Sequence, residues 1–140
     1  MKNLYVNFNG VIANFHSVEW NRMEIESGEN IDFLNEFSEM EFKDNIAAIR
    51  ALSNTYNIYI ISRVASEEAK EKMVKWITKK IPEVHESNIL IFVNISRKCY
   101  ATNKDDILID DNARYTKQWN KYGGTGILIA KGENIRKYLE

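Results

Sequence analysis

The chain has 140 residues, a formal net charge of −1 at pH 7, and 44% hydrophobic and 11% aromatic residues. This length and composition suit one compact domain over residues 1–140 with a substantial apolar core. The near-zero charge argues against a nucleic-acid-binding protein or one that binds an acidic membrane. A single cysteine, Cys99, excludes an internal disulfide, and no apolar run is long enough to cross a bilayer. We therefore expect a cytoplasmic protein, with a monomer and a homodimer both left open.

The first stretch of the chain has the pattern of a strand followed by a sharp turn. Residues 4–8 are a short apolar run, and Asn9-Gly10 is a pair that marks a tight turn. The apolar stretch 11–15 then predicts the start of a helix. Strand, turn and helix place polar side chains at the carboxyl edge of a parallel sheet, where α/β proteins have their sites. We therefore expect Asn7 and Asn9 to lie at a functional site.

Further along the chain, short apolar runs alternate with helical patterns. The expected strands are the runs at 58–61, 89–93, 107–109 and 126–130. The expected helices have apolar residues at helical spacing and lie at 42–54, between Ser66 and Pro82, at 113–122 and at 134–139. Strands that alternate with helices indicate a parallel sheet covered on both sides. The sequence thus predicts a three-layer α/β domain of about five mostly parallel strands, with the first strand central.

The segment 16–41 interrupts this alternation. It is polar, acidic and aromatic, with a turn signal at 27–30. It is too short and too acidic for a separate domain, so we expect a small insert, or lid, over the edge of the sheet. His16, at its start, is a further candidate for the lining of a pocket.

Four short motifs occur in order along the chain. They are Asn7-Phe8-Asn9-Gly10-Val11, Ser62 after the second strand, a lysine before the fourth strand, and Ile109-Asp110-Asp111 at the end of that strand. Together they resemble the haloacid dehalogenase (HAD) superfamily of phosphohydrolases, whose first motif is Asp-x-Asp-Gly-Val. Residues 71–77, Lys98 and 107–112 are similar to the 5'(3')-deoxyribonucleotidase family within it. The resemblance covers almost the whole chain and implies a HAD-like Rossmannoid fold.

The resemblance also implies a phosphatase chemistry that this chain lacks the groups to perform. In the family, the first aspartate of the motif attacks phosphorus, and the second transfers protons to and from the reacting oxygens. These positions are Asn7 and Asn9 here. A carboxamide is a poor nucleophile, and it has no pKa suited to proton transfer near pH 7. We therefore predict turnover close to background.

A metal ion and an anion site are implied in the same way. The family's Mg²⁺ ligands correspond to Asn7, the backbone carbonyl of Asn9 and Asp111, with Asp110 just behind. Mg²⁺ prefers carboxylate oxygens, so a neutral residue 7 should weaken its binding. The run Asp110-Asp111-Asn112 also has the composition of a helix N-cap.

The predicted anion-binding half of the site is intact. Ser62 can donate a hydroxyl hydrogen bond to a phosphate, and Lys98 can supply a positive charge. Lys104 is the alternative lysine, but it lies beside two aspartates, where a solvated ion pair is the simpler interpretation. Arg63 could also reach a phosphate, although an ordinary surface position is favoured.

The sequence therefore predicts a catalytically impaired, nucleotidase-type scaffold. We expect it to bind a phosphorylated small molecule, such as a nucleoside monophosphate, without cleaving it. Two alternatives stay open. The first is a Mg²⁺-dependent 5'-nucleotidase inactivated on purpose by Asp→Asn changes, since natural loss and deliberate change leave the same residues. The second is a protein-binding module whose surface is the insert at 16–41.

Overall fold

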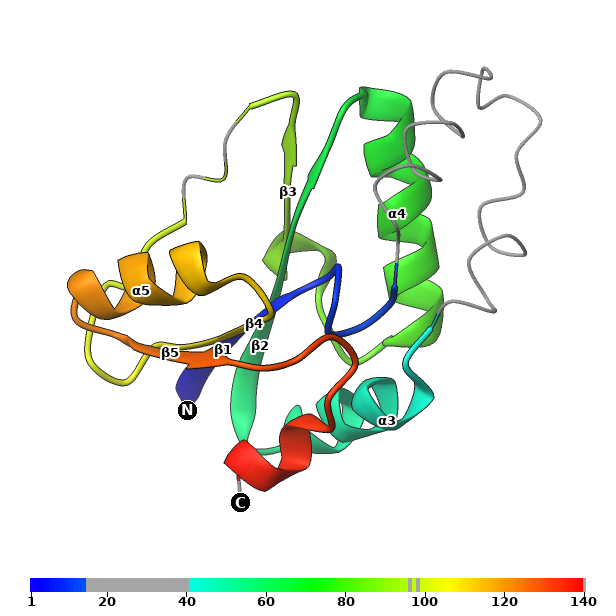
Figure 1. Cartoon of the computed structure of the whole chain (residues 1–140). Coiled ribbons are helices and arrows are strands. Elements are labelled where there is room, and N and C mark those ends of the chain that lie inside the picture. Colours follow the sequence, from blue (N-terminus) through cyan, green and yellow to red (C-terminus); the bar gives the residue numbers. More distant parts are fainter. Residues whose placement is uncertain (15–40, 96, 98, 140) are drawn as a thin grey trace.

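A sheet of five parallel strands forms the centre of the protein (Figure 1). The structure is a computed structural model that describes residues 1–14, 41–95, 97 and 99–139. The strand order is β3-β2-β1-β4-β5. The predicted three-layer α/β class, with the first strand central, is confirmed. The predicted insert lies outside the described residues except for Glu41.

The strands follow the short apolar runs of the sequence. Their bounds are Lys2–Asn7 (β1), Tyr56–Val64 (β2), Ile89–Val93 (β3), Ile107–Asp110 (β4) and Thr125–Leu128 (β5). β2 extends beyond the predicted 58–61 because its last residues pair with β3, from Ser62 opposite Ile91 to Val64 opposite Val93. Ladder pairing therefore continues the strand through polar residues that its apolar pattern does not include.

Polar side chains cap the starts of two of the α-helices. Their bounds are Lys43–Leu52 (α3), Glu67–Lys80 (α4) and Ala113–Lys121 (α5), with short 3₁₀ helices at Glu86–Asn88 (η3) and Ile135–Tyr138 (η4). The Ser66 side chain caps α4 and the Asn112 side chain caps α5, whereas α3 begins after Phe42 without a side-chain cap. Among the described residues, no helix combines the length and the apolar character needed to cross a membrane.

The helices cover the two faces of the sheet as separate layers (Figure 1). Along β1, Leu4 and Val6 pack into the core beneath α3 and α4, whereas Tyr5 packs into the core beneath α5. Each layer is anchored by a fully buried tryptophan, Trp76 of α4 and Trp119 of α5. This alternation follows from the two-residue period of a strand.

The predicted helix at 11–15 is wrong for its described residues, 11–14. This part of the chain turns back instead, because the N–H groups of Ile12 and Ala13 both donate to the carbonyl of Phe8. The buried Asn45 of α3 stabilises the turn: its Nδ2 donates to the carbonyl of Val11 and its Oδ1 accepts from the N–H of Ile135. Local backbone hydrogen bonds and a buried side chain distant in the sequence therefore stabilise this conformation together.

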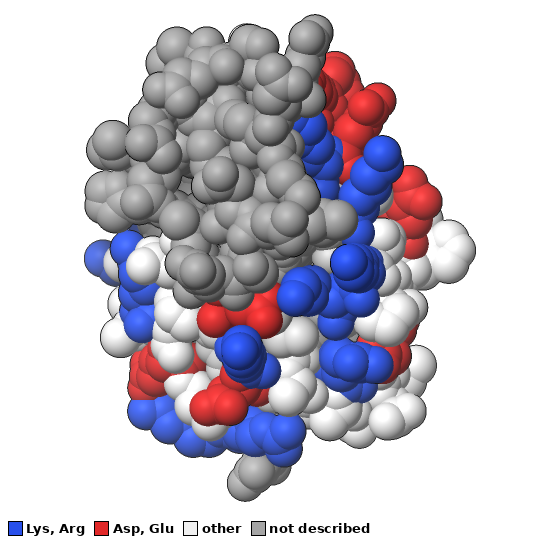
Figure 2. Space-filling model, turned by 90° about the vertical axis from the view of Figure 1, so that its right-hand side faces the viewer, with Lys and Arg blue, Asp and Glu red and all other residues white. Residues whose placement is uncertain are grey.

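Charges of both signs alternate over the surface near α4. Figure 2 shows lysines and arginines interspersed with aspartates and glutamates on the described part of this face. Ion pairs of α4 include Lys72 with Glu68 at 3.2 Å and Lys80 with Glu41 at 3.0 Å. The described part of this face thus presents no uniform field of one sign. That nucleic acid is not a partner stays a prediction.

A buried carboxylate, Asp106, stabilises the amino edge of the sheet. It accepts hydrogen bonds from the N–H and the hydroxyl of Thr102, at 2.9 and 2.7 Å, and from Asn3 Nδ2 at 3.1 Å. Burial opposes ionisation, but these hydrogen bonds outweigh it and lower the pKa of Asp106 below its usual value. Asp106 therefore stabilises the fold when it is ionised.

Replacing this carboxylate should flatten the acid dependence of stability. Because the folded-state pKa of Asp106 is lowered, its contribution is present above pH about 4 and is lost as the pH falls below that value. We expect Asp106→Asn to be less stable at pH 7 and to lose less of its stability on acidification. Urea unfolding at both pH values measures this. Asp105→Asn, at an exposed neighbouring position, should follow the wild type.

Candidate functional site

A pocket of about 310 Å³ opens at the carboxyl edge of the sheet, where β1 and β4 end. These two strands lie side by side, with Val6 opposite Ile109, so Asn7 and Asp110 follow at the same level. The strand order reverses direction between β1 and β4. On one side, β2 and β3 follow outward from β1; on the other side, β5 follows outward from β4. Such a switch point is where open α/β sheets bind their ligands.

The pocket gathers most of the residues that the sequence analysis selects. It is lined by Asn7, Asn9, Ser62, Arg63, Arg97, Asp110, Asp111, Asn112 and Tyr115. Lys98 and His16 lie outside the described residues. Lys104 lies at the opposite, amino edge, in a depression that it shares with Lys2 and Asp105. Lys104 therefore does not contribute to this pocket.

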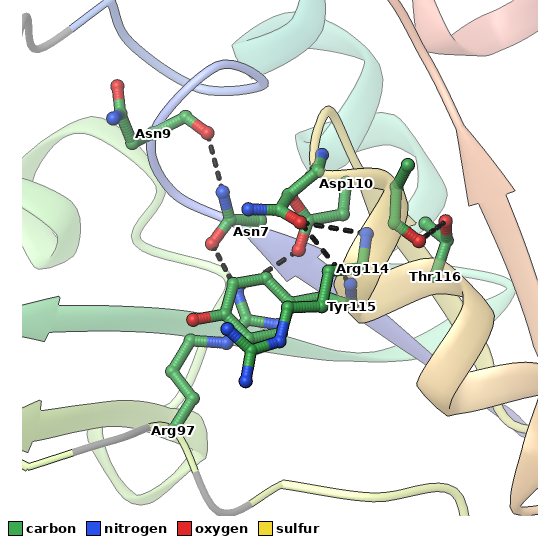
Figure 3. Close-up of polar contacts among 9 residues, drawn as sticks. Asn7, Asn9, Arg97, Asp110, Arg114, Tyr115 and Thr116 are labelled. Carbon is green, nitrogen blue, oxygen red and sulfur yellow. Dashed lines mark hydrogen bonds and ion pairs between the residues drawn. The ribbon is translucent and has the colours of Figure 1, made fainter.

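Arg97 is the main pocket residue that the sequence analysis does not identify. Its side chain comes from the loop between β3 and β4 and is 8% exposed. Its Nη1 donates to Asn7 Oδ1 at 2.6 Å and to Asp110 Oδ2 at 3.1 Å (Figure 3). The guanidinium also lies over the ring of Tyr115, 3.8 Å from its centroid. It is therefore held by three side chains, from β1, β4 and α5.

Asp110 is the buried partner of this arginine. Its carboxylate is completely buried, and its second oxygen accepts a hydrogen bond from the N–H of Asn112 at 3.1 Å. Burial raises the pKa of Asp110 to about 6, although Arg97 and the Asn112 N–H favour its ionised form. Sequence analysis places Asp110 behind the site; in the structure it lines the pocket and is paired with Arg97. Of the predicted cap run, the residue that caps α5 is Asn112.

The first motif forms a turn that is closed by its own side chain. Asn7 Nδ2 donates to the backbone carbonyl of Asn9 at 2.5 Å. Gly10 follows with φ of +91°, and a Cβ built on it would lie 2.3 Å from the carboxyl carbon of Asp111. Only glycine allows this backbone conformation and this close approach to Asp111.

The oxygens implied as Mg²⁺ ligands are largely occupied by hydrogen-bond donors. Asn7 Oδ1 faces the Arg97 guanidinium, and the Asn9 carbonyl faces the Asn7 amide. Of the implied ligands, the Asp111 carboxylate is the one with no hydrogen bond to a described residue. Mg²⁺ needs a near-octahedral shell of oxygens, and N–H groups and a guanidinium oppose it. In this arrangement the residues present do not fit a Mg²⁺ ion.

Two further side chains bring donors to the same pocket from β2. Ser62 is 6% exposed, and its hydroxyl makes no hydrogen bond to another described residue. Arg63 is exposed at the rim. Together with Arg97, they supply one hydroxyl and two guanidinium groups, which are common donors to phosphate and carboxylate oxygens.

A signal for Arg97 does exist in the sequence, but it is indirect. An aspartate that ends a short apolar strand is expected to be buried, and a buried carboxylate needs a cationic or hydrogen-bonding partner. Asp110 meets this description. The loop at 94–104 offers Arg97 and Lys98 as neighbouring candidates, and no spacing rule separates the two.

Comparisons with known proteins do not extend this picture. No protein-family model matches the chain, and no curated protein matches its sequence significantly.

Removing the Arg97 side chain should destabilise the fold. Arg97→Met leaves the Asp110 carboxylate buried without its counter-ion, which typically costs about 3–5 kcal/mol. Because Arg97 lowers the pKa of Asp110, which is about 6 in the wild type, its removal should raise that pKa further, and protonation should reduce the loss as the pH falls toward 6. Urea unfolding at several pH values measures both effects.

Two comparisons isolate the ion pair. The double variant Arg97→Met/Asp110→Asn should recover most of the lost stability, because no charge is then left unpaired. Arg63→Met removes an exposed arginine of the same pocket and should change stability by no more than about 0.5 kcal/mol. Equal losses for Arg97→Met and Arg63→Met would contradict this account.

Proposed function

We propose that the protein binds a phosphorylated small molecule at the carboxyl edge of its sheet and does not hydrolyse it. The proposed ligand class is a phosphomonoester such as a nucleoside monophosphate. The proposed scaffold is a HAD-like, nucleotidase-type phosphohydrolase that lacks its catalytic carboxylates. A cytoplasmic location, where phosphorylated metabolites are available, is part of this proposal.

The observation that carries the proposal is the convergence of donors on one pocket. Arg63, Arg97 and Ser62 line it together, at the switch point between β1 and β4. Guanidinium groups bind phosphate oxygens with two parallel hydrogen bonds, and a hydroxyl adds a third direction of contact. A volume of about 310 Å³ suits a small ligand.

The absence of turnover follows from the side chains at the end of β1. Asn7 donates one amide hydrogen to the Asn9 carbonyl and accepts from Arg97 through its oxygen. A neutral amide held in this way offers no anionic oxygen to attack phosphorus. Asn9 likewise offers no group that exchanges protons near pH 7.

Calorimetric titration with orthophosphate and with nucleoside monophosphates tests the binding. We expect one site per chain and no release of phosphate from the esters. Ser62→Ala should weaken binding about 2- to 10-fold, and Arg63→Met about tenfold or more, in line with the usual strength of neutral and charged hydrogen bonds.

Lys104→Met is the matched control, because it removes a cation from the opposite edge of the sheet. Binding by this variant should equal that of the wild type. Equal weakening by Lys104→Met and Arg63→Met would indicate nonspecific attraction, and no heat with any phosphate compound would refute the proposal. Phosphatase activity in Asn7→Asp/Asn9→Asp would instead favour an inactivated nucleotidase.

A further inference from the structure

The hydrogen bonds around Arg97 assign it a role that a divalent metal ion would otherwise have. We infer that its guanidinium is the resident cation of the pocket, so that an oxyanion binds there without Mg²⁺. The identity of the oxyanion as a phosphoryl group rests on the proposed function. The exclusion of the metal ion rests on the geometry alone.

The guanidinium contacts two of the side-chain oxygens that the resemblance assigns to a metal site, those of Asn7 and Asp110. Its Nη1 is 2.6 Å from Asn7 Oδ1 and 3.1 Å from Asp110 Oδ2. Tyr115 covers one face of it, with the ring centroid at 3.8 Å. Figure 3 shows the arginine reaching across from its loop to these three side chains. A positive charge is thus already fixed in place before any ligand arrives.

Arg97 has N–H groups that its contacts with Asn7 and Asp110 do not use and that could donate to an anion. A guanidinium has five N–H groups, and the two contacts above both use Nη1. Nε is buried and makes no hydrogen bond within the described part of the chain, and the hydrogen bonds of Arg97 to described residues use neither Nε nor Nη2. A buried donor without a partner is costly, and an oxyanion that accepts from this side would remove the cost.

Among the described lining residues, the charges are balanced without a metal ion. Two arginines, Arg63 and Arg97, face two aspartates, Asp110 and Asp111, among the lining residues. With carboxylates in place of Asn7 and Asn9, the same lining would carry two more negative charges. Those charges would repel an entering anion and attract a divalent cation. The two amides remove that need.

The amide of Asn7 also makes a favourable hydrogen bond to the backbone of the same turn. Its Nδ2 lies 2.5 Å from the carbonyl oxygen of Asn9. A carboxylate in the same position would place two oxygens at this distance, which is unfavourable unless a cation lies between them. The amide hydrogen takes that place. Two oxygens near the end of β1 are therefore satisfied by N–H donors: the Asn9 carbonyl by Asn7, and Asn7 Oδ1 by Arg97.

The first experiment measures anion binding with and without metal. Orthophosphate and a nucleoside monophosphate are titrated into the wild-type chain in excess EDTA and, separately, in MgCl₂. We expect the same Kd in both buffers. The variant Arg97→Met/Asp110→Asn, which leaves no buried charge unpaired, should bind about 10- to 100-fold more weakly. Binding that requires Mg²⁺ would overturn the inference and leave the proposed function standing.

The second experiment titrates Mg²⁺ alone and follows thermal unfolding. The wild type should show no rise in Tm, because Asn7 Oδ1 and Asp110 Oδ2 face the Arg97 guanidinium and the Asn9 carbonyl faces the Asn7 amide. Asn7→Asp/Arg97→Met adds a carboxylate and removes the resident cation, so its Tm should rise with Mg²⁺ concentration. A variant that folds only with Mg²⁺ counts as the same result. Asn7→Asp/Arg63→Met has the same charge change but keeps Arg97, and it should not respond.

The two experiments separate the two claims. If no phosphate compound binds in either buffer, the proposed function fails, and the Mg²⁺ titration alone decides the inference. A rise in the Tm of the wild type with Mg²⁺ overturns it. Equal responses of the two double variants also overturn it, because the identity of the missing arginine would then not matter.

Discussion

The buried ion pair between Arg97 and Asp110 is the constraint on which the carboxyl edge of the sheet depends. Asp110 ends β4 with no exposed surface, and a buried carboxylate is stable as an ion only when paired and hydrogen-bonded. The loop between β3 and β4 must therefore return to the sheet to bring Arg97 to it. Asn7, at the end of β1, accepts from the same guanidinium. One contact thus joins two strands, a loop and, through Tyr115, the start of α5.

The same atoms serve the stability of the fold and the chemistry of the pocket. A guanidinium held by Asn7, Asp110 and Tyr115 has little freedom left to lose when an anion arrives, so the site is preorganised. The amide at position 7 is consistent with this role, because it satisfies the Asn9 carbonyl without adding negative charge. This arrangement suits the proposed function, in which the pocket binds an anion and does not attack it.

The sequence predicts the strands and helices well because their signals are local. Apolar runs mark β3 and β4, and Ser66 marks the start of α4. The segment 11–14 is mispredicted because its apolar pattern does not show the turn that its backbone makes with Phe8 and that the distant Asn45 stabilises.

The residues of the candidate site also fall into those that local sequence signals predict and those that they do not. Asn7, Ser62 and Asp110 are predictable because the carboxyl ends of parallel strands meet at one edge. Arg97 is not, because it lies in an irregular polar loop whose path follows from the burial of Asp110. Its neighbour Lys98 carries the same charge, so sequence alone does not select between them.

A crystal structure of the protein, from crystals grown with both MgCl₂ and orthophosphate, tests most directly whether Arg97 and not Mg²⁺ is the cation of the pocket. The account predicts the Arg97 guanidinium within hydrogen-bonding distance of Asn7 and Asp110, with any phosphate bound directly to it. A magnesium ion ligated by Asn7, the Asn9 carbonyl and Asp111, with Arg97 turned away, would contradict it.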